Sequence, residues 1–218
     1  MRGSAMNRIV GLLTQWGLRL SLKRLREPDA MALLEQRGVP EVWRRSIAEA
    51  IAVIDLLDAR ITPLDQELAP LARADQRVVL LDTIPGVGEL LGLTLASEIG
   101  DVCRFGSPRK LIGYAGLAPK INQSGDRSRT GALSKAGSRT LRWAAVEAAQ
   151  HAWRPSNPWH QLYTDLAARA GKNPAKSAVA RKILIAAWHI LSRQQPFTPP
   201  APRGRDSASA ISRCFLAA

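Results

Sequence analysis

One serine of this sequence lies in a setting where its hydroxyl group could act as a nucleophile. Ser124 precedes Gly125 within a segment, 119–131, that is rich in glycine, serine and arginine. A serine beside a glycine can be exposed, and nearby guanidinium groups can stabilise the charge that develops when its oxygen attacks a phosphodiester. Serine is also a common turn or cap residue. The residues by themselves therefore leave both interpretations open.

Basic side chains surround this serine. Between Lys120 and Arg142 the sequence contains six lysine or arginine residues and one acid, Asp126. Lysine, arginine and backbone amide groups make most protein contacts to DNA phosphates, so the stretch predicts a phosphate-binding clamp. The candidate DNA-binding residues here are Lys120, Arg127, Arg129, Lys135, Arg139 and Arg142.

A second candidate phosphate site is the Pro-Gly-Val-Gly turn at 85–88. Apolar residues precede it and recur after it, which predicts two helices joined by a tight turn, a helix-hairpin-helix. Gly86 and Gly88 permit backbone angles and close approach that a side chain would prevent. The free N–H groups at the start of the second helix suit a phosphate. The alternative is a tight turn that binds no ligand.

A third basic feature follows a helix start. Ser107 and Pro108 are typical of an N-cap and a first helical position. Arg109 and Lys110 then lie near that start, where they either contact phosphate or form an ordinary solvated face.

The overall charge supports a polyanionic partner. The chain has 218 residues, a formal net charge of +13 and a pI of about 10.9, and nucleic acid is the commonest partner of such a surface. Its two cysteines fit neither a disulfide framework nor a zinc site, which favours a reducing cytosol. Apolar runs are shorter than the roughly 18 residues of a membrane span. We therefore expect a cytoplasmic protein without a membrane partner.

The elements that must position these residues are mainly helices. Residues 7–45 are basic and helical in pattern, with a short helix after Asp29 that ends near Gly38. Residues 41–79 carry an apolar stripe close to a coiled-coil seam. The stripe consists of Ile47, Ile51, Ile54, Leu57, Ile61, Leu64, Leu68 and Leu71. Pro63 and Pro70 predict two helices or one kinked helix, which forms either an interface or an ordinary core pair.

The remaining sequence predicts a main domain and a tail. A short β-hairpin is expected around 117–133, a polar connection at 154–174 and a strong helix at 175–193. We place a helical, coiled-coil-like region at 1–79, the main domain at 80–194 and a disordered tail at 195–218. Tryptophan can stack on bases, but helical apolar patterns favour core packing for most of the candidates. These are Trp143, Trp153, Trp159 and Trp188.

The order of motifs from about residue 81 to 142 resembles the C-terminal domain of the IS116/IS110/IS902 family of DEDD-type insertion-sequence transposases. The matching motifs are Ile-Pro-Gly-Val-Gly at 84–88, Glu-Ile-Gly-Asp at 98–101, Arg-Phe at 104–105, Leu-Ile-Gly-Tyr-Ala-Gly-Leu-Ala-Pro at 111–119, Ser-Gly at 124–125, Lys-Ala-Gly-Ser at 135–138 and Leu-Arg at 141–142. The helical region at 7–80 resembles the coiled-coil stretch that precedes this domain in the family.

The resemblance implies a DNA recombinase that works in two parts. A RuvC-like domain binds divalent metal through four acids, and a serine of the C-terminal domain forms a covalent link to DNA. The position that matches this serine is Ser124. The resemblance also implies partners: DNA, in some members a structured guide RNA, and a second copy or a full-length transposase.

This sequence departs from the family pattern in one respect. No set of acids in residues 1–40 fits the four-acid pattern, so we expect a fragment that lacks the RuvC-like domain and holds no cofactor of its own. Divalent metal such as Mg²⁺ is expected only together with that acidic domain. The sequence therefore predicts a mainly α, DNA-binding transposase fragment. The alternatives are an inactive DNA- or RNA-binding module and an oligomerisation partner.

Overall fold

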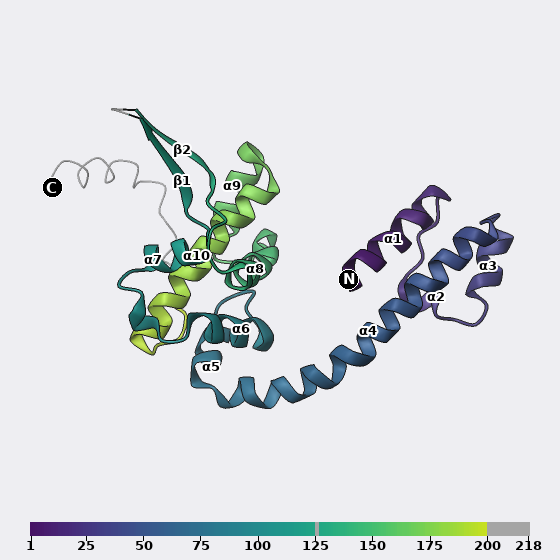
Figure 1. Cartoon of the computed structure of the whole chain (residues 1–218), viewed down its shortest axis with the longest axis horizontal. Coiled ribbons are helices and arrows are strands. Elements are labelled where there is room, and N and C mark those ends of the chain that lie inside the picture. The colour runs from purple at the N-terminus through teal and green to yellow at the C-terminus, as the bar shows by residue number, and fades with distance from the viewer. Residues whose placement is uncertain (125–126, 200–218) are drawn as a thin grey trace. The chain divides into compact units, whose positions relative to one another are not determined.

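The computed structural model describes residues 1–124 and 127–199 and is mainly α-helical, as predicted. It forms two compact units, Met1–Leu68 and Ala69–Ala218, and Figure 1 gives their elements in chain order. The division lies within helix α4 (Glu41–Ala74), whereas the sequence analysis places the boundary between residues 79 and 80. Most of the tail predicted to be disordered lies outside the described residues.

The first unit is a small helical core. It consists of α1 (Arg2–Gln15), α2 (Leu22–Leu25), α3 (Ala30–Gln36) and the first part of α4. Its buried side chains are mostly aliphatic and include Ile9, Leu34, Ile47 and Ile54. Asp29 is the N-cap of α3, and Gly38 takes a positive φ of 77° just after its end. The short helix predicted between these two residues is therefore confirmed.

Helix α4 runs through both of its prolines, so of the two predicted alternatives, two helices or one kinked helix, the first is wrong. Each proline leaves one carbonyl of the preceding turn without its helical partner, and this part of the helix is exposed, so water can satisfy that carbonyl. The apolar stripe divides along the helix. Its early members, such as Ile47 and Ile54, are buried in the first unit, whereas Ile61, Leu64 and Leu71 are exposed.

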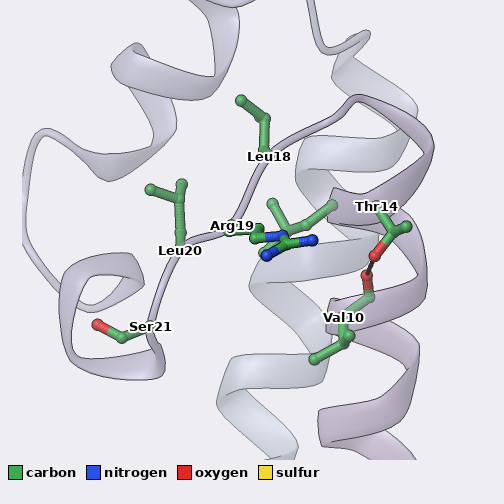
Figure 2. Close-up of a pocket in the computed structure, with 7 residues that line it drawn as sticks. Val10, Thr14, Leu18, Arg19, Leu20 and Ser21 are labelled. Atoms are coloured by element: carbon green, nitrogen blue, oxygen red, sulfur yellow. Dashed lines mark hydrogen bonds between the residues drawn. The ribbon is translucent and has the colours of Figure 1, made fainter.

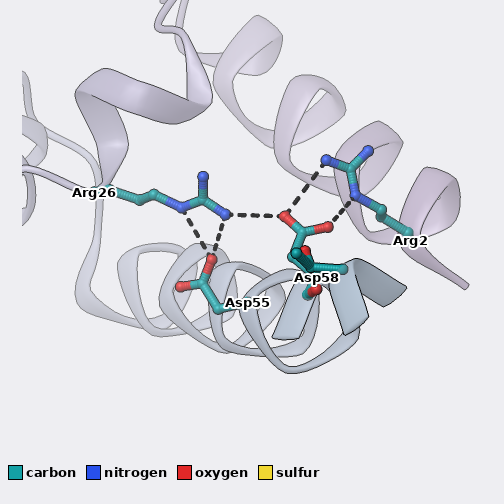
Figure 3. A network of polar contacts seen from close by, with 5 residues as sticks. Arg2, Arg26, Asp55 and Asp58 are labelled. Carbon is teal, nitrogen blue, oxygen red and sulfur yellow. Dashed lines mark hydrogen bonds and ion pairs between the residues drawn. The ribbon is translucent and has the colours of Figure 1, made fainter. Parts of the chain in front are cut away.

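Four charged side chains fasten α1 and the end of α2 to α4 (Figure 3). Arg2 donates through Nε to Oδ1 of Asp58 at 2.5 Å. Arg26 bridges both acids, with Nε 2.9 Å from Oδ1 of Asp55 and Nη2 3.3 Å from Oδ2 of Asp58. The hydrogen bond from Arg2 lowers the pKa of Asp58. These contacts occupy both acids with arginine partners.

We expect this network to make stability fall in acid. Because the folded-state pKa of Asp58 is lowered, its contribution is present above the unfolded pKa of about 3.9 and is lost as the pH falls through the lower folded value. Asp58→Asn should therefore lose less thermal stability than the wild type between about pH 6 and about pH 3. Circular dichroism melts measure this. Asp65→Asn, an exposed acid on the same helix, should behave like the wild type; equal losses in all three proteins would contradict the prediction.

The second unit is built around one long helix. Figure 1 shows α10 (Lys172–Arg193) passing through the middle of this unit. Around it pack α5 (Gln76–Asp82), α7 (Pro108–Tyr114), α8 (Arg139–Ala148) and α9 (His160–Ala170), together with the 3-10 turns η1 (Val102–Arg104) and η2 (Ala149–Trp153). Helix α6 (Glu89–Ile99) packs on α5 and α8. The buried residues of α10 include Val179, Ile183, Leu184 and Ala187.

Two features of this unit differ from the sequence prediction. The segment 154–174, expected to be a polar connection, contains the helix α9, whose Tyr163 is buried and whose Leu162 and Leu166 pack against the core. Its apolar residues recur at helical spacing, but it is contact with α10 and η2 that covers them. Helix α10 also begins at Lys172 and includes Pro174, because a proline in the first turn costs no helical hydrogen bond.

The predicted β-hairpin is confirmed. Strand β1 (Pro119–Ser124) pairs antiparallel with β2 (Arg127–Leu133), and the pair projects from the helices of its unit in Figure 1. The register pairs Ser124 with Arg127 and Asn122 with Arg129. An irregularity between Pro119 and Ile121 then shifts the register by one residue, as a β-bulge does.

None of the helices formed by residues 1–124 and 127–199 is both long enough and apolar enough to cross a membrane.

Candidate nucleic-acid interface

Backbone hydrogen bonds join the two segments at the base of the hairpin, residues 114–118 and 134–138. We call this set of contacts the lock. The amide of Ser134 donates to the carbonyl of Ala118 at 2.9 Å, and that of Lys135 donates to Gly116 at 3.0 Å. The amide of Ser138 donates to the carbonyl of Tyr114 at 2.8 Å. The chain entering the hairpin and the chain leaving it are therefore fixed to each other at three points.

Two glycines make this close approach possible. Gly137 has a φ of 120°, and a Cβ added there would lie 2.1 Å from the carbonyl oxygen of Tyr114. Gly116 has a φ of 67°, and its added Cβ would lie 2.5 Å from the carbonyl oxygen of Ala136. Both angles lie in the region that favours glycine. The lock explains why glycines stand at these positions in the two sequence motifs around the hairpin.

The start of α8 is tied to two neighbouring helices. Ser138 is its N-cap: the hydroxyl accepts from the amide of Leu141 at 3.0 Å and donates to Oε2 of Glu98 on α6 at 2.7 Å. Arg142 donates through Nη1 to the carbonyl of Ala115 at 2.9 Å. Arg142 was predicted to bind phosphate, and in the structure one of its nitrogens instead binds the backbone that leads into the hairpin.

An aromatic cluster supports the same region from the α7 side. The rings of Phe105 and Tyr114 lie 5.3 Å apart, and the guanidinium of Arg104 lies 4.6 Å from the first ring and 4.8 Å from the second. Arg104 also donates to the backbone carbonyl of Glu98 at 2.9 Å. Sequence reasoning assigned no role to Glu98, Arg104 or Tyr114, although all three stand in the motifs that carry the family resemblance.

The predicted site residues occupy the hairpin and its base. Ser124 is the last residue of β1, Arg127 begins β2 and Arg129 follows on the same strand. The side chains of 121–130 lie outside what the structure describes. Lys120, Lys135 and Arg139 are exposed, the first on β1 and the others at and just after the lock.

Arg109 and Lys110 are exposed at the beginning of α7. Ser107 is the N-cap and Pro108 the first helical residue, as predicted, although the serine hydroxyl makes no capping hydrogen bond. Among the described residues, no side-chain hydrogen bond or ion pair joins either of these basic residues to the hairpin. Their role as phosphate ligands therefore stays a prediction.

The glycine turn between α5 and α6 serves packing. Gly86 has a φ of 94°, and a Cβ there would lie 2.3 Å from the carbonyl oxygen of Ala148. Gly88 is the N-cap of α6 and has open space around it. Glu89 follows in the first turn and pairs with Arg73 at 2.7 Å. An acid therefore already occupies the positive end of this helix, which makes a phosphate contact there less favourable than the sequence suggested.

The tryptophans divide into two groups, so the expectation of core packing is only partly right. Trp159 is 6% exposed, and Trp188 donates through Nε1 to the carbonyl of Phe105 at 2.9 Å. In contrast, Trp143 is 50% and Trp153 is 55% exposed. Helical periodicity placed most of these tryptophans in or near apolar patterns and could not distinguish a covered face from an uncovered one.

A pocket of the first unit offers no free nucleophile. Figure 2 shows this pocket, about 390 Å³ in volume, beside the loop that follows α1. The hydroxyl of Thr14 donates to the carbonyl of Val10 at 2.7 Å, and that of Ser21 accepts from the amide of Arg24 at 3.2 Å. Both hydroxyls are thus used within helices, and the remaining lining is aliphatic apart from Arg19.

The described residues also offer no metal site. No group of three or more histidine, cysteine, aspartate or glutamate side chains is placed to hold an ion in the part of the chain that the structure describes. These residues therefore do not fit the divalent metal that the family resemblance implies.

Comparison with known proteins assigns the family. Residues 78–165 match the family model described as Transposase IS116/IS110/IS902 family, a range that contains the hairpin, its lock and α8. Residues 78–165 form a domain of that family. The matched range ends within α9, so α10, which completes the core of the second unit, lies beyond it.

Several curated relatives support the assignment. The chain is 27% identical over 203 residues to a transposase for insertion sequence element IS1111A of Coxiella burnetii, covering 90% of this chain and 56% of that protein. It is 28% identical over 208 residues to a probable family 20 transposase of Pseudomonas aeruginosa, covering 91% and 61%. It is 31% identical over 144 residues to a pilin gene-inverting protein of Moraxella bovis, covering 63% and 45%. The chain thus spans about half of the length of these relatives.

Proposed function

We propose that this member of the transposase family binds DNA and acts in the movement of an insertion sequence, with Ser124 as the nucleophile. The observation that carries the proposal is the register of the hairpin. The backbone pairs Ser124 with Arg127 and Asn122 with Arg129, so the serine and the two arginines stand at neighbouring positions of the two strands. The lock at the hairpin base supports this grouping by fixing where the hairpin leaves the helices.

The proposed chemistry is a transesterification. The Oγ atom of Ser124 forms a bond to a DNA phosphorus while one bridging oxygen leaves as a strand hydroxyl, and the serine proton passes to solvent or to the leaving oxygen. The two arginines would stabilise the charge on the non-bridging oxygens. The number of phosphoester bonds is unchanged, so a hydroxyl of another strand can displace the serine and rejoin the DNA.

A covalent adduct tests the proposal. Purified chain is mixed with a labelled DNA junction that carries the ends of the element, with Mg²⁺ present, and the products are separated on a denaturing gel. We expect a protein–DNA adduct that is absent in Ser124→Ala. Ser128→Ala is the matched control, because Ser128 is a serine of the same hairpin that pairs with Gln123 and not with an arginine; it should retain the adduct.

Two other outcomes would change the assignment. If the adduct persists in Ser124→Ala and is lost in Ser128→Ala, the nucleophile is wrongly placed. If no adduct forms with the wild type but DNA binding weakens steeply with salt, the chain is a DNA-binding module without catalysis, since that dependence reports displaced counterions. A structured RNA that competes with DNA for the same surface would extend this alternative to RNA.

The exposed part of the α4 stripe favours a second role as an oligomerisation element. Ile61 and Leu64 lie one turn apart and are 40% and 55% exposed, and a helix of the same kind from another copy or a full-length transposase could cover them. The mass of the purified chain in solution, measured by light scattering before the adduct assay, shows whether it self-associates.

A further inference from the structure

Helix α8 presents a tryptophan to solvent beside the base of the hairpin. Trp143 is 50% exposed, although a large aromatic side chain contributes strongly to stability when it is buried. The opposite face of the helix is fully used, because Leu141, Ala144, Ala145 and Ala148 are all buried in the core of the second unit. The helix therefore has no freedom to turn Trp143 inward.

The charges around this tryptophan change from positive to negative along the helix. Arg139 is exposed one turn before it and Glu147 is exposed one turn after it, and residues four apart on a helix are neighbours on its surface. Lys135 is also exposed just before the helix. Arg139 and Lys135 form no ion pair with any described residue. An anionic strand is thus attracted to the hairpin side of Trp143 and repelled from the Glu147 side.

The backbone beneath these side chains is held by hydrogen bonds. Lys135 donates its amide to Gly116, and Ser138 caps α8 while it is bound to Glu98. A ligand would therefore meet a platform whose position is already set, so less entropy is lost on binding than with a mobile loop.

The other tryptophans of the second unit do not offer the same surface. Trp159 packs against Phe197 at 5.4 Å and is buried, and Trp188 is held by its hydrogen bond to Phe105. Trp153 is exposed, but the guanidinium of Arg154 lies over its ring at 5.8 Å. Trp143 differs from these because it is exposed on α8 and has the basic residue Arg139 one turn before it on the same helix.

We propose that Trp143 stacks on an unpaired base of a DNA strand, whose phosphates contact Arg139 and Lys135. Stacking on an indole requires a base with a free face, whereas bases within a duplex are covered by their neighbours. A basic surface with an exposed aromatic ring is the usual chemistry of single-strand binding. The inference rests on the proposed partner, DNA, but not on the role of Ser124.

Equilibrium binding tests the proposal with the full chain. Fluorescence anisotropy would follow a labelled single-stranded oligonucleotide, the same sequence as a duplex, and the same sequence as RNA. Trp143→Ala should weaken single-strand binding about 10-fold to 100-fold and duplex binding far less. Trp143→Phe keeps an aromatic face and should recover most of the affinity. Trp153→Ala, which removes a similarly exposed indole, should leave affinity nearly unchanged.

The outcomes separate this inference from the proposed function. If the wild type binds single strands and Trp143→Ala binds them equally well, the stacking proposal is wrong while DNA binding stands. If the wild type binds no DNA even at low salt, the proposed function itself fails. Equal losses of affinity in Trp143→Ala and Trp153→Ala would show that Trp143 is not the stacking site. A preference for the RNA that depends on Trp143 would show that the ligand is not DNA.

Discussion

Gly137→Ala is expected to lower the free energy of unfolding of the second unit by roughly 2 to 5 kcal/mol, from backbone strain and steric overlap together. The φ of 120° is unfavourable for alanine, and the new Cβ would lie 2.1 Å from the carbonyl oxygen of Tyr114. Because that carbonyl accepts the amide of Ser138, any movement that relieves the overlap also loosens the lock at the hairpin base. The change should therefore abolish the Ser124 adduct as well.

Two other glycines distinguish steric overlap from conformational strain. Gly100 has a φ of 60° but nothing within 4 Å of an added Cβ, so Gly100→Ala carries the conformational cost alone. Gly113 lies within α7 in open space, and Gly113→Ala should be neutral or slightly stabilising. Urea denaturation followed by hydrogen exchange of peptides from α8, which lies in the second unit, gives the order of the three variants. A Gly137→Ala protein as stable as Gly113→Ala would show that the lock does not exist in solution.

Ile183→Ala should lower the free energy of unfolding of the second unit by about 2 to 5 kcal/mol. Ile183 is fully buried on α10, and this helix packs on α5, α7, α8 and α9. Few neighbours can move into the space that the side chain leaves, because the helix is surrounded on several sides. Lys182→Ala changes the adjacent exposed residue and should stay within about 0.5 kcal/mol of the wild type.

The measurement must report on one unit, because the chain contains two and a single transition cannot be assumed. Hydrogen exchange measured on peptides from α8 and α10 meets this need. We expect faster exchange in both helices of Ile183→Ala and no change in α1 or α3. Faster exchange confined to α10 would mean that this helix does not hold the unit together. The expected result implies that the family-matched range, 78–165, requires α10 to fold.

Local sequence patterns determined the main elements of this protein. Apolar spacing predicted a mainly α chain, Ser107 and Pro108 marked a helix start, and the glycine-rich and serine-rich segment predicted the hairpin that places Ser124 at the end of β1. The ordered motifs around it also determined the family. Each of these features depends on residues near one another in the chain, so the sequence contains the information directly.

Tertiary structure alone decided which surfaces are covered. Trp143 lies in a helical apolar pattern yet is 50% exposed, whereas Trp159, in the segment predicted to be a polar connection, is buried, because burial depends on what other segments pack there. Helix α9 was missed for the same reason. The lock likewise joins residues 114–118 to 134–138, and no local rule specifies that Gly137 must approach Tyr114. Long-range packing therefore fixed the position of the hairpin, while the local sequence fixed only that a hairpin forms.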